Sequence, residues 1–127
     1  MSLCTLFSVT ETPGFPRYSN VYQRLGMEEH HFDSKRKAIG QLKTIKPDVV
    51  VAEFLYGYGN NYAGVNVCNL DVFLYSLQKY APDARVIVLV DKSEREYVDK
   101  LEALFSIHAI LTMPITERQL EQVLSDL

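Results

Sequence analysis

Blocks of apolar and polar residues alternate along the chain and predict strands and helices in turn. Four short runs are rich in aliphatic and β-branched residues, and a fifth, residues 27–32, has strand length but is more polar, which suits a sheet edge. The run at 48–54 is almost continuously apolar, as in strands that are buried on both faces. We expect strands at residues 3–9, 27–32, 48–54, 85–90 and 109–113.

Between these runs, apolar residues recur every three or four positions, which is the spacing of one buried helix face. Each of these segments also has a recognisable start. The predicted helix starts or caps are Arg17, Asp33 or Ser34, Asn69, Ser93 and Thr116. Two of them form capping boxes, because Glu96 follows Ser93 and Gln119 follows Thr116 at the required spacing. In the fourth helix we expect the inner face to consist of Tyr97, Leu101, Leu104 and Phe105.

Strands that alternate with helices predict parallel pairing, because each crossover must be right-handed and must pack a helix against the sheet. The pattern contains five such units and no internal repeat or linker. We therefore expect a three-layer α/β architecture, (βα)5, in which residues 1–127 form a single domain.

Composition narrows the function classes. With 47% hydrophobic and 23% charged residues the chain is typical of a globular domain, and its net charge of -3 gives no general attraction to nucleic acid or an anionic membrane. Two cysteines are too few for a disulfide scaffold. No membrane span or signal peptide is apparent, so we expect a cytoplasmic protein that binds neither nucleic acid nor membrane directly.

The most informative polar residue is Glu53, which follows the apolar run at the edge where parallel sheets usually place their chemistry. The ends of the later strands do not provide polar partners for Glu53, since Val90 has no hydroxyl group and Met113 carries no positive charge. The sequence thus predicts a site-shaped framework without the groups of a working site.

Three motifs resemble those of the receiver domains of two-component response regulators. The run Lys46-Pro47-Asp48-Val49-Val50-Val51-Ala52-Glu53 is similar to the segment that ends in the family's phosphoacceptor aspartate. The run 86–90 is similar to the strand that ends in its Thr or Ser, and 110–115 to its aromatic-Leu-x-Lys-Pro signature. The resemblance spans nearly the whole chain and implies a flavodoxin-like sheet with strand order 2-1-3-4-5.

The same resemblance implies a degenerate pocket. Receivers hold Mg²⁺ with an acidic pair at the end of the first strand, where this chain has Ser8 and Val9. Glu53 stands at the phosphoacceptor position, Val90 at the Thr or Ser position and Met113 at the Lys position. Phosphoryl transfer depends on positioning and charge neutralisation, so we expect no phosphorylation, no enzymatic activity and no cofactor.

Two interpretations of Glu53 stay open. Its permanent negative charge could mimic the phosphorylated state, or it could be an ordinary solvated or hydrogen-bonded glutamate. In either case we expect a receiver-like signalling domain that acts as a protein interaction or regulatory module. By analogy with receivers, the fourth helix, fifth strand and fifth helix would carry a homodimer or partner contact, with Tyr97, Lys100, Ile110 and Arg118 as candidate contact residues.

The alternative function is a flavodoxin-like module that binds a small planar ligand. The loop at 55–68 is rich in Tyr, Gly and Asn, and Tyr56, Tyr58 and Tyr62 could stack on such a molecule. We expect no metal site, because the neighbours His30 and His31 would point to opposite faces of a strand.

Overall fold

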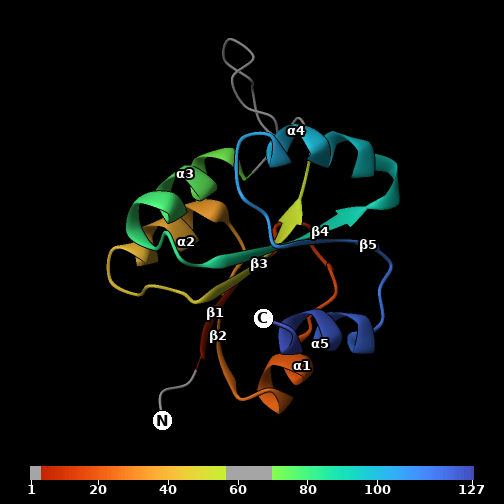
Figure 1. Cartoon of the computed structure of the whole chain (residues 1–127). Coiled ribbons are helices and arrows are strands. Elements are labelled where there is room, and N and C mark those ends of the chain that lie inside the picture. Colours follow the sequence, from red (N-terminus) through yellow and green to blue (C-terminus); the bar gives the residue numbers. More distant parts are fainter. Residues whose placement is uncertain (1–3, 57–69) are drawn as a thin grey trace.

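Five parallel strands form the central sheet in the order β2-β1-β3-β4-β5 (Figure 1). The computed structural model describes residues 4–56 and 70–127. The strands are β1 (Cys4–Val9), β2 (Met27–Phe32), β3 (Val49–Phe54), β4 (Arg85–Asp91) and β5 (Ala109–Met113). The predicted α/β fold and its 2-1-3-4-5 order are confirmed, and the polar strand β2 lies at an edge of the sheet as expected.

Helices cover both faces of this sheet. They are α1 (Ser19–Arg24), α2 (Lys35–Leu42), α3 (Asp71–Tyr80), the 3₁₀ turn η2 (Lys92–Tyr97), α4 (Val98–Glu102) and α5 (Glu117–Ser125). Residues of α1 and α5 pack in one hydrophobic cluster, and residues of α2, α3 and α4 pack in another on the opposite face. Figure 1 shows these two helical layers with the sheet between them.

Strand β3 is the centre of the domain. All six of its residues are buried, and it pairs with β1 on one side and β4 on the other. Its side chains alternate between the two clusters, with Val50, Ala52 and Phe54 on the α2–α3 face and Val49 and Val51 on the α1–α5 face. Glu53, next to the last residue of β3, therefore lies on a strand whose position is fixed on both faces and both edges.

The start of α5 agrees with the sequence prediction. The Thr116 side chain accepts a hydrogen bond from the Gln119 amide at 3.1 Å, and the Gln119 side chain accepts one from the Thr116 amide at 2.8 Å. Both halves of the capping box are thus formed.

The start of the fourth helical segment differs from the prediction. Asp91, not Ser93, is the capping residue, and its carboxylate accepts hydrogen bonds from the Ser93 amide at 2.9 Å and the Ser93 hydroxyl at 2.5 Å. These two contacts also lower the pKa of Asp91. The chain then forms a 3₁₀ turn, and the α-helix begins only at Val98.

This late start changes which residues face the core. Val98 and Leu101 are fully buried and Phe105 nearly so, whereas Leu104 is 54% exposed and does not belong to the inner face that was predicted for it. The short helix ends before Leu104, so helical spacing no longer determines the direction of that side chain.

Two leucines three residues apart should therefore respond very differently to truncation. We expect Leu101→Ala to lower the free energy of unfolding by about 2–5 kcal/mol, because it leaves a cavity in the core. Leu104→Ala should change it by less than about 0.5 kcal/mol, as at other exposed positions. Chemical denaturation of both variants checks this, and equal losses would contradict the assignment.

Candidate functional site

Glu53 is buried and its carboxylate is held by the loop that follows β1. Only 4% of the residue is exposed. Its Oε1 accepts hydrogen bonds from the backbone amides of Glu11 at 2.8 Å and Thr12 at 2.9 Å, and the Thr12 hydroxyl donates to Oε2. This geometry is that of a buried, hydrogen-bonded glutamate.

The loop is shaped to present those amides. Its backbone turns at Thr12, whose carbonyl accepts from the Phe15 amide at 3.1 Å, and Gly14 has a φ of 80°, which glycine adopts without strain. The Glu11 carboxylate points elsewhere and accepts from the Lys35 amide at the start of α2, at 3.3 Å. Glu11 therefore donates a hydrogen bond from its amide to Glu53 and accepts one with its side chain from the first residue of α2. We call the contacts of Glu53 with residues 11 and 12 the Glu53 clamp.

A hollow of about 400 Å³ lies beside the clamp at the carboxyl edge of the sheet. Its lining residues are Thr12, Phe15, Pro16, Glu53, Phe54, Leu55, Asp91, Ser93, Glu94 and Met113. Three of them are carboxylates, and none of the described residues that line the hollow is Lys or Arg.

Each of the three carboxylates accepts hydrogen bonds from neighbouring backbone. Glu53 holds the loop after β1, Asp91 caps the turn after β4, and Glu94 accepts from the Tyr56 amide at 3.1 Å. Within residues 4–56 and 70–127, no group of three or more His, Cys, Asp or Glu residues is arranged to hold a metal ion. An approaching phosphoryl group would therefore meet negative charge that no neighbouring cation of the lining offsets.

The other predicted pocket positions are dispersed. Met113 lines the same hollow as Glu53, and its sulfur accepts a contact from the Tyr18 hydroxyl at 3.9 Å. Val90 and Val9 are completely buried in the cluster beneath α2 and α3. Ser8 is buried on the other face of β1. The structure thus brings Met113 to Glu53 but places Ser8, Val9 and Val90 in the interior.

The candidate ligand loop and the candidate interface are in contact with each other. The ring of Tyr56, from the candidate ligand loop, stacks on the ring of Tyr97, from the candidate interface, with centroids 3.8 Å apart and planes 13° apart. The Lys100 ammonium lies 5.7 Å from the Tyr56 centroid and 5.9 Å from that of Tyr97. Together with the Glu94 contact, this stack fastens the exit of β3 to η2 and α4.

The other residues of the candidate interface and the candidate ligand loop do not take part in this stack. Ile110 is half-buried and packs against the cluster that contains α3 and α4. Arg118 is exposed and lines a hollow with Arg24 and Glu121 between α5 and α1. Tyr58 and Tyr62 lie outside the described residues.

A second polar cluster, which the sequence analysis missed, connects β1, β2 and the start of α1. The Ser8 hydroxyl lies 2.5 Å from Glu29 Oε2 and 3.0 Å from His31 Nδ1. Ser19 donates to Glu29 Oε1 at 2.7 Å, and an Arg17 nitrogen lies 3.6 Å from Oε2. His30, by contrast, contacts Glu28 and the Phe7 ring, so the two histidines face opposite sides as expected.

The protons in this cluster can be assigned. A hydroxyl has one proton, and Ser8 gives it to the carboxylate of Glu29 because ionised acceptors form the stronger bond. His31 must then donate from Nδ1 to the Ser8 oxygen. In this hydrogen-bond arrangement His31 is the donor to Ser8 and not the acceptor of its proton.

No protein-family model and no curated protein matches this chain. Solved structures do match. The chemotaxis response regulator CheY4 of Vibrio cholerae is 15% identical, with 98% of each chain covered and a TM-score of 0.75. The signal receiver domain of a LuxO repressor protein from Vibrio parahaemolyticus is 12% identical, with 98% of this chain and 88% of that chain covered and a TM-score of 0.74.

An uncharacterised protein from Neptuniibacter caesariensis is 18% identical, over 97% of this chain and 85% of that one, with a TM-score of 0.78. At such identities the likeness is one of fold. The chain has the receiver fold. This agrees with the flavodoxin-like fold and strand order that the sequence motifs implied. Among the described residues of this receiver fold, no helix combines the length and apolar character needed to cross a bilayer.

Sequence reasoning identified Glu53 but not its partners. Within the described residues, its partners include two main-chain amides and one hydroxyl at residues 11 and 12, in the first loop at the carboxyl edge of the receiver fold. The only available signal was the segment Thr10-Glu11-Thr12-Pro13-Gly14, whose residue types favour a tight turn with exposed amides.

The polar cluster generates a pH prediction. Burial lowers the pKa of His31 most strongly and Arg17 adds repulsion, while Glu29 and Asp33 act in the opposite direction. The folded chain therefore binds this proton more weakly than the unfolded chain. The neutral His31 side chain therefore contributes to the free energy of unfolding. This contribution is fully present above the ordinary His pKa of about 6.5 and is lost as pH falls through the lower pKa of His31 in the folded state.

The variant His31→Asn removes this titration, because its amide nitrogen can replace Nδ1 as the donor to Ser8. We expect the wild type to lose free energy of unfolding relative to the variant as pH falls from about 7.5 to about 5. Urea denaturation at a series of pH values measures the difference. A constant difference, or a relative gain by the wild type in acid, would contradict the assignment.

Proposed function

We propose that this chain is a receiver-fold signalling domain that binds other proteins and does not accept phosphate. The observation that supports this most strongly is the Glu53 clamp. The carboxylate at the position that resembles a phosphoacceptor is buried and already accepts three hydrogen bonds from its own chain. Phosphorylation would have to break these contacts and expose the group.

Charge supports the same conclusion. The described lining of the hollow contains three carboxylates and lacks a basic side chain that could neutralise a phosphoryl group. Met113, at the position that resembles the receiver lysine, contacts the Tyr18 hydroxyl instead. The domain accordingly would use no cofactor and catalyse no reaction.

The clamp also bears on the idea of a built-in phosphate mimic. A phosphoryl group acts on its surroundings through contacts to Lys and Thr side chains, and here the charge of Glu53 is directed to the loop after β1. In the proposed function Glu53 is a structural acceptor that holds this loop in one conformation.

Partner binding would use the region of α4, β5 and α5, in a protein of the cytoplasm. Tyr97 and Lys100 are held there by the stack with Tyr56, and Ile110 and Arg118 belong to the same proposed region. A homodimer through this region is part of the proposal. The matched structures carry names such as response regulator and signal receiver domain, and this fits a role in signalling.

The test is incubation with acetyl phosphate and Mg²⁺ followed by intact-mass measurement. We expect no adduct on the wild type, and none on Glu53→Asp, because the shorter side chain restores neither a metal site nor a cation. An active receiver domain treated in parallel shows that the reagent works. A phosphate-sized mass increase that maps to Glu53 or a neighbouring acid would refute the proposed function.

A further inference from the structure

Positive charge is concentrated on α2 and the residues beside it. Five of the 13 Lys and Arg residues of the chain lie within residues 35–46. With Asp33 as the one acid, the five cations give residues 33–46 a net charge of +4. Since the whole chain has a net charge of -3, the remaining residues carry -7. The segment is therefore a basic region of an otherwise acidic domain.

Three residues of this region form a stripe on the outer face of α2. Arg36, Gly40 and Lys43 follow one another at helical spacing, and all three are exposed. Ala38 and Leu42, on the opposite face of the helix, are buried in the core. Lys43 is the residue at the C-cap and still has helical backbone angles. We call Arg36, Gly40 and Lys43 the α2 stripe.

The domain itself does not neutralise the two cations of the α2 stripe. Within residues 4–56 and 70–127, neither Arg36 nor Lys43 has a hydrogen-bond or ion-pair partner. The nearby acid Asp33 is paired with Lys37, whose ammonium lies 2.8 Å from its carboxylate. The charge of the stripe is thus available to another molecule.

The other arginines lie beside carboxylates. Three of them form ion pairs, which are Arg17 with Glu29, Arg24 with Glu117 and Glu121, and Arg95 with Asp99. A fourth, Arg118, lines a hollow together with Glu117 and Glu121.

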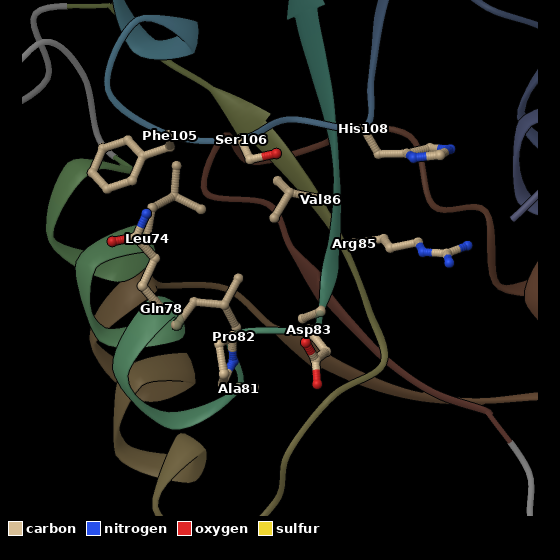
Figure 2. A pocket seen from close by; sticks show the side chains of 12 residues that line it. Leu74, Gln78, Ala81, Pro82, Asp83, Arg85, Val86, Phe105, Ser106 and His108 are labelled. Carbon is tan, nitrogen blue, oxygen red and sulfur yellow. The ribbon is translucent and has the colours of Figure 1, made fainter.

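Arg85 also has acids as neighbours, since it lines a hollow with Asp48 and Asp83. Figure 2 shows its side chain directed away from Leu74 and Phe105, which line the adjacent cavity of about 330 Å³. Arg36 therefore differs from the other arginines in lying on a face without a balancing acid.

Gly40 is not required by packing within the chain. A Cβ atom added there would meet no other atom within 4 Å. Glycine in the interior of a helix is less stable than alanine, because it loses more backbone entropy on folding. The first turn of α2 also has three cations and no acid, which is unfavourable at the positive end of a helix dipole. Local features that oppose stability in this way are typical of surfaces that serve binding.

We propose that the α2 stripe binds an acidic segment of a partner protein, with carboxylates beside Arg36 and Lys43 and its main chain passing over Gly40. Positive charge without internal partners favours an acidic occupant, and Arg36 can donate two bonds to one carboxylate. The missing side chain at Gly40 leaves room for another backbone to approach the helix. A polypeptide fits better than nucleic acid, because the acidic remainder of the domain repels a long polyanion.

This surface is separate from the proposed partner region at α4, β5 and α5. No residue of the α2 stripe belongs to those elements or lines the hollow beside Glu53. The α2 stripe would give the signalling domain a second protein contact. Its failure would leave the phosphorylation test unaffected, and the reverse also holds.

The test is a titration of the ¹⁵N-labelled full chain with poly-L-glutamate at low ionic strength, followed by amide chemical shifts. We expect saturable shifts centred on residues 35–46 that weaken when salt is added, because salt screens exposed charges. A neutral Gly-Ser peptide of the same length should cause no shifts.

Four variants sharpen the test. Arg36→Gln and Lys43→Gln should each weaken binding about two- to fivefold, as expected for an exposed ion pair. Gly40→Gln keeps every charge and should raise the denaturation midpoint, since glutamine favours a helix more than glycine, yet weaken binding by blocking the approach. Lys92→Gln is the matched control, because Lys92 is exposed and unpaired among the described residues, and it should leave binding unchanged.

Amide dispersion of each variant reports whether it remains folded. Shifts that do not saturate or that spread over the whole surface would overturn the proposal. Wild-type affinity in Gly40→Gln, or an equal loss in Lys92→Gln and Arg36→Gln, would do so as well. Tighter binding of a DNA duplex or of phosphatidylserine vesicles to the same residues would also overturn it, since the occupant would then be a nucleic acid or a membrane.

Discussion

The hydrogen bonds between the Glu53 carboxylate and the loop after β1 organise the carboxyl edge of this domain. A buried carboxylate is tolerated only where donors satisfy it, and here the amides of Glu11 and Thr12 and the Thr12 hydroxyl do so. The same contacts fix the loop, and through the Glu11 side chain they connect it to the first turn of α2. Two acidic side chains, those of Glu53 and Glu11, thereby join β3, the first loop and a helix.

The neighbouring acids follow the same principle. Asp91 caps the turn after β4, and Glu94 accepts from the amide of Tyr56, whose ring stacks on Tyr97. In a working phosphoacceptor pocket, carboxylates must be free to hold a cation and to receive a phosphoryl group. In this chain the carboxylates of Glu53, Asp91 and Glu94 accept hydrogen bonds from neighbouring backbone, and this supports the proposal that the domain does not accept phosphate.

Sequence reasoning was most successful where local physics decides the structure. The strands were predictable because continuous apolar runs are buried whatever their exact partners, and the capping box at Thr116 because its residues are close in sequence. Leu104 was misplaced because the cap at Asp91 and the 3₁₀ turn after it delay the helix. The Glu53 clamp joins residues 41 and 42 positions apart, and main-chain amides have no side-chain signature, so the sequence signalled the turn at residues 10–14 but not its contact with Glu53.

Amide hydrogen exchange at Glu11 and Thr12, compared between the wild type and Glu53→Ala, tests the clamp most directly. If the carboxylate holds these amides, both are protected in the wild type despite their position in a loop, and both lose protection in the variant. The Val88 amide in the buried strand β4 should remain protected in both proteins and so show that the fold persists. Equal exchange of Glu11 and Thr12 in the two proteins would contradict the account.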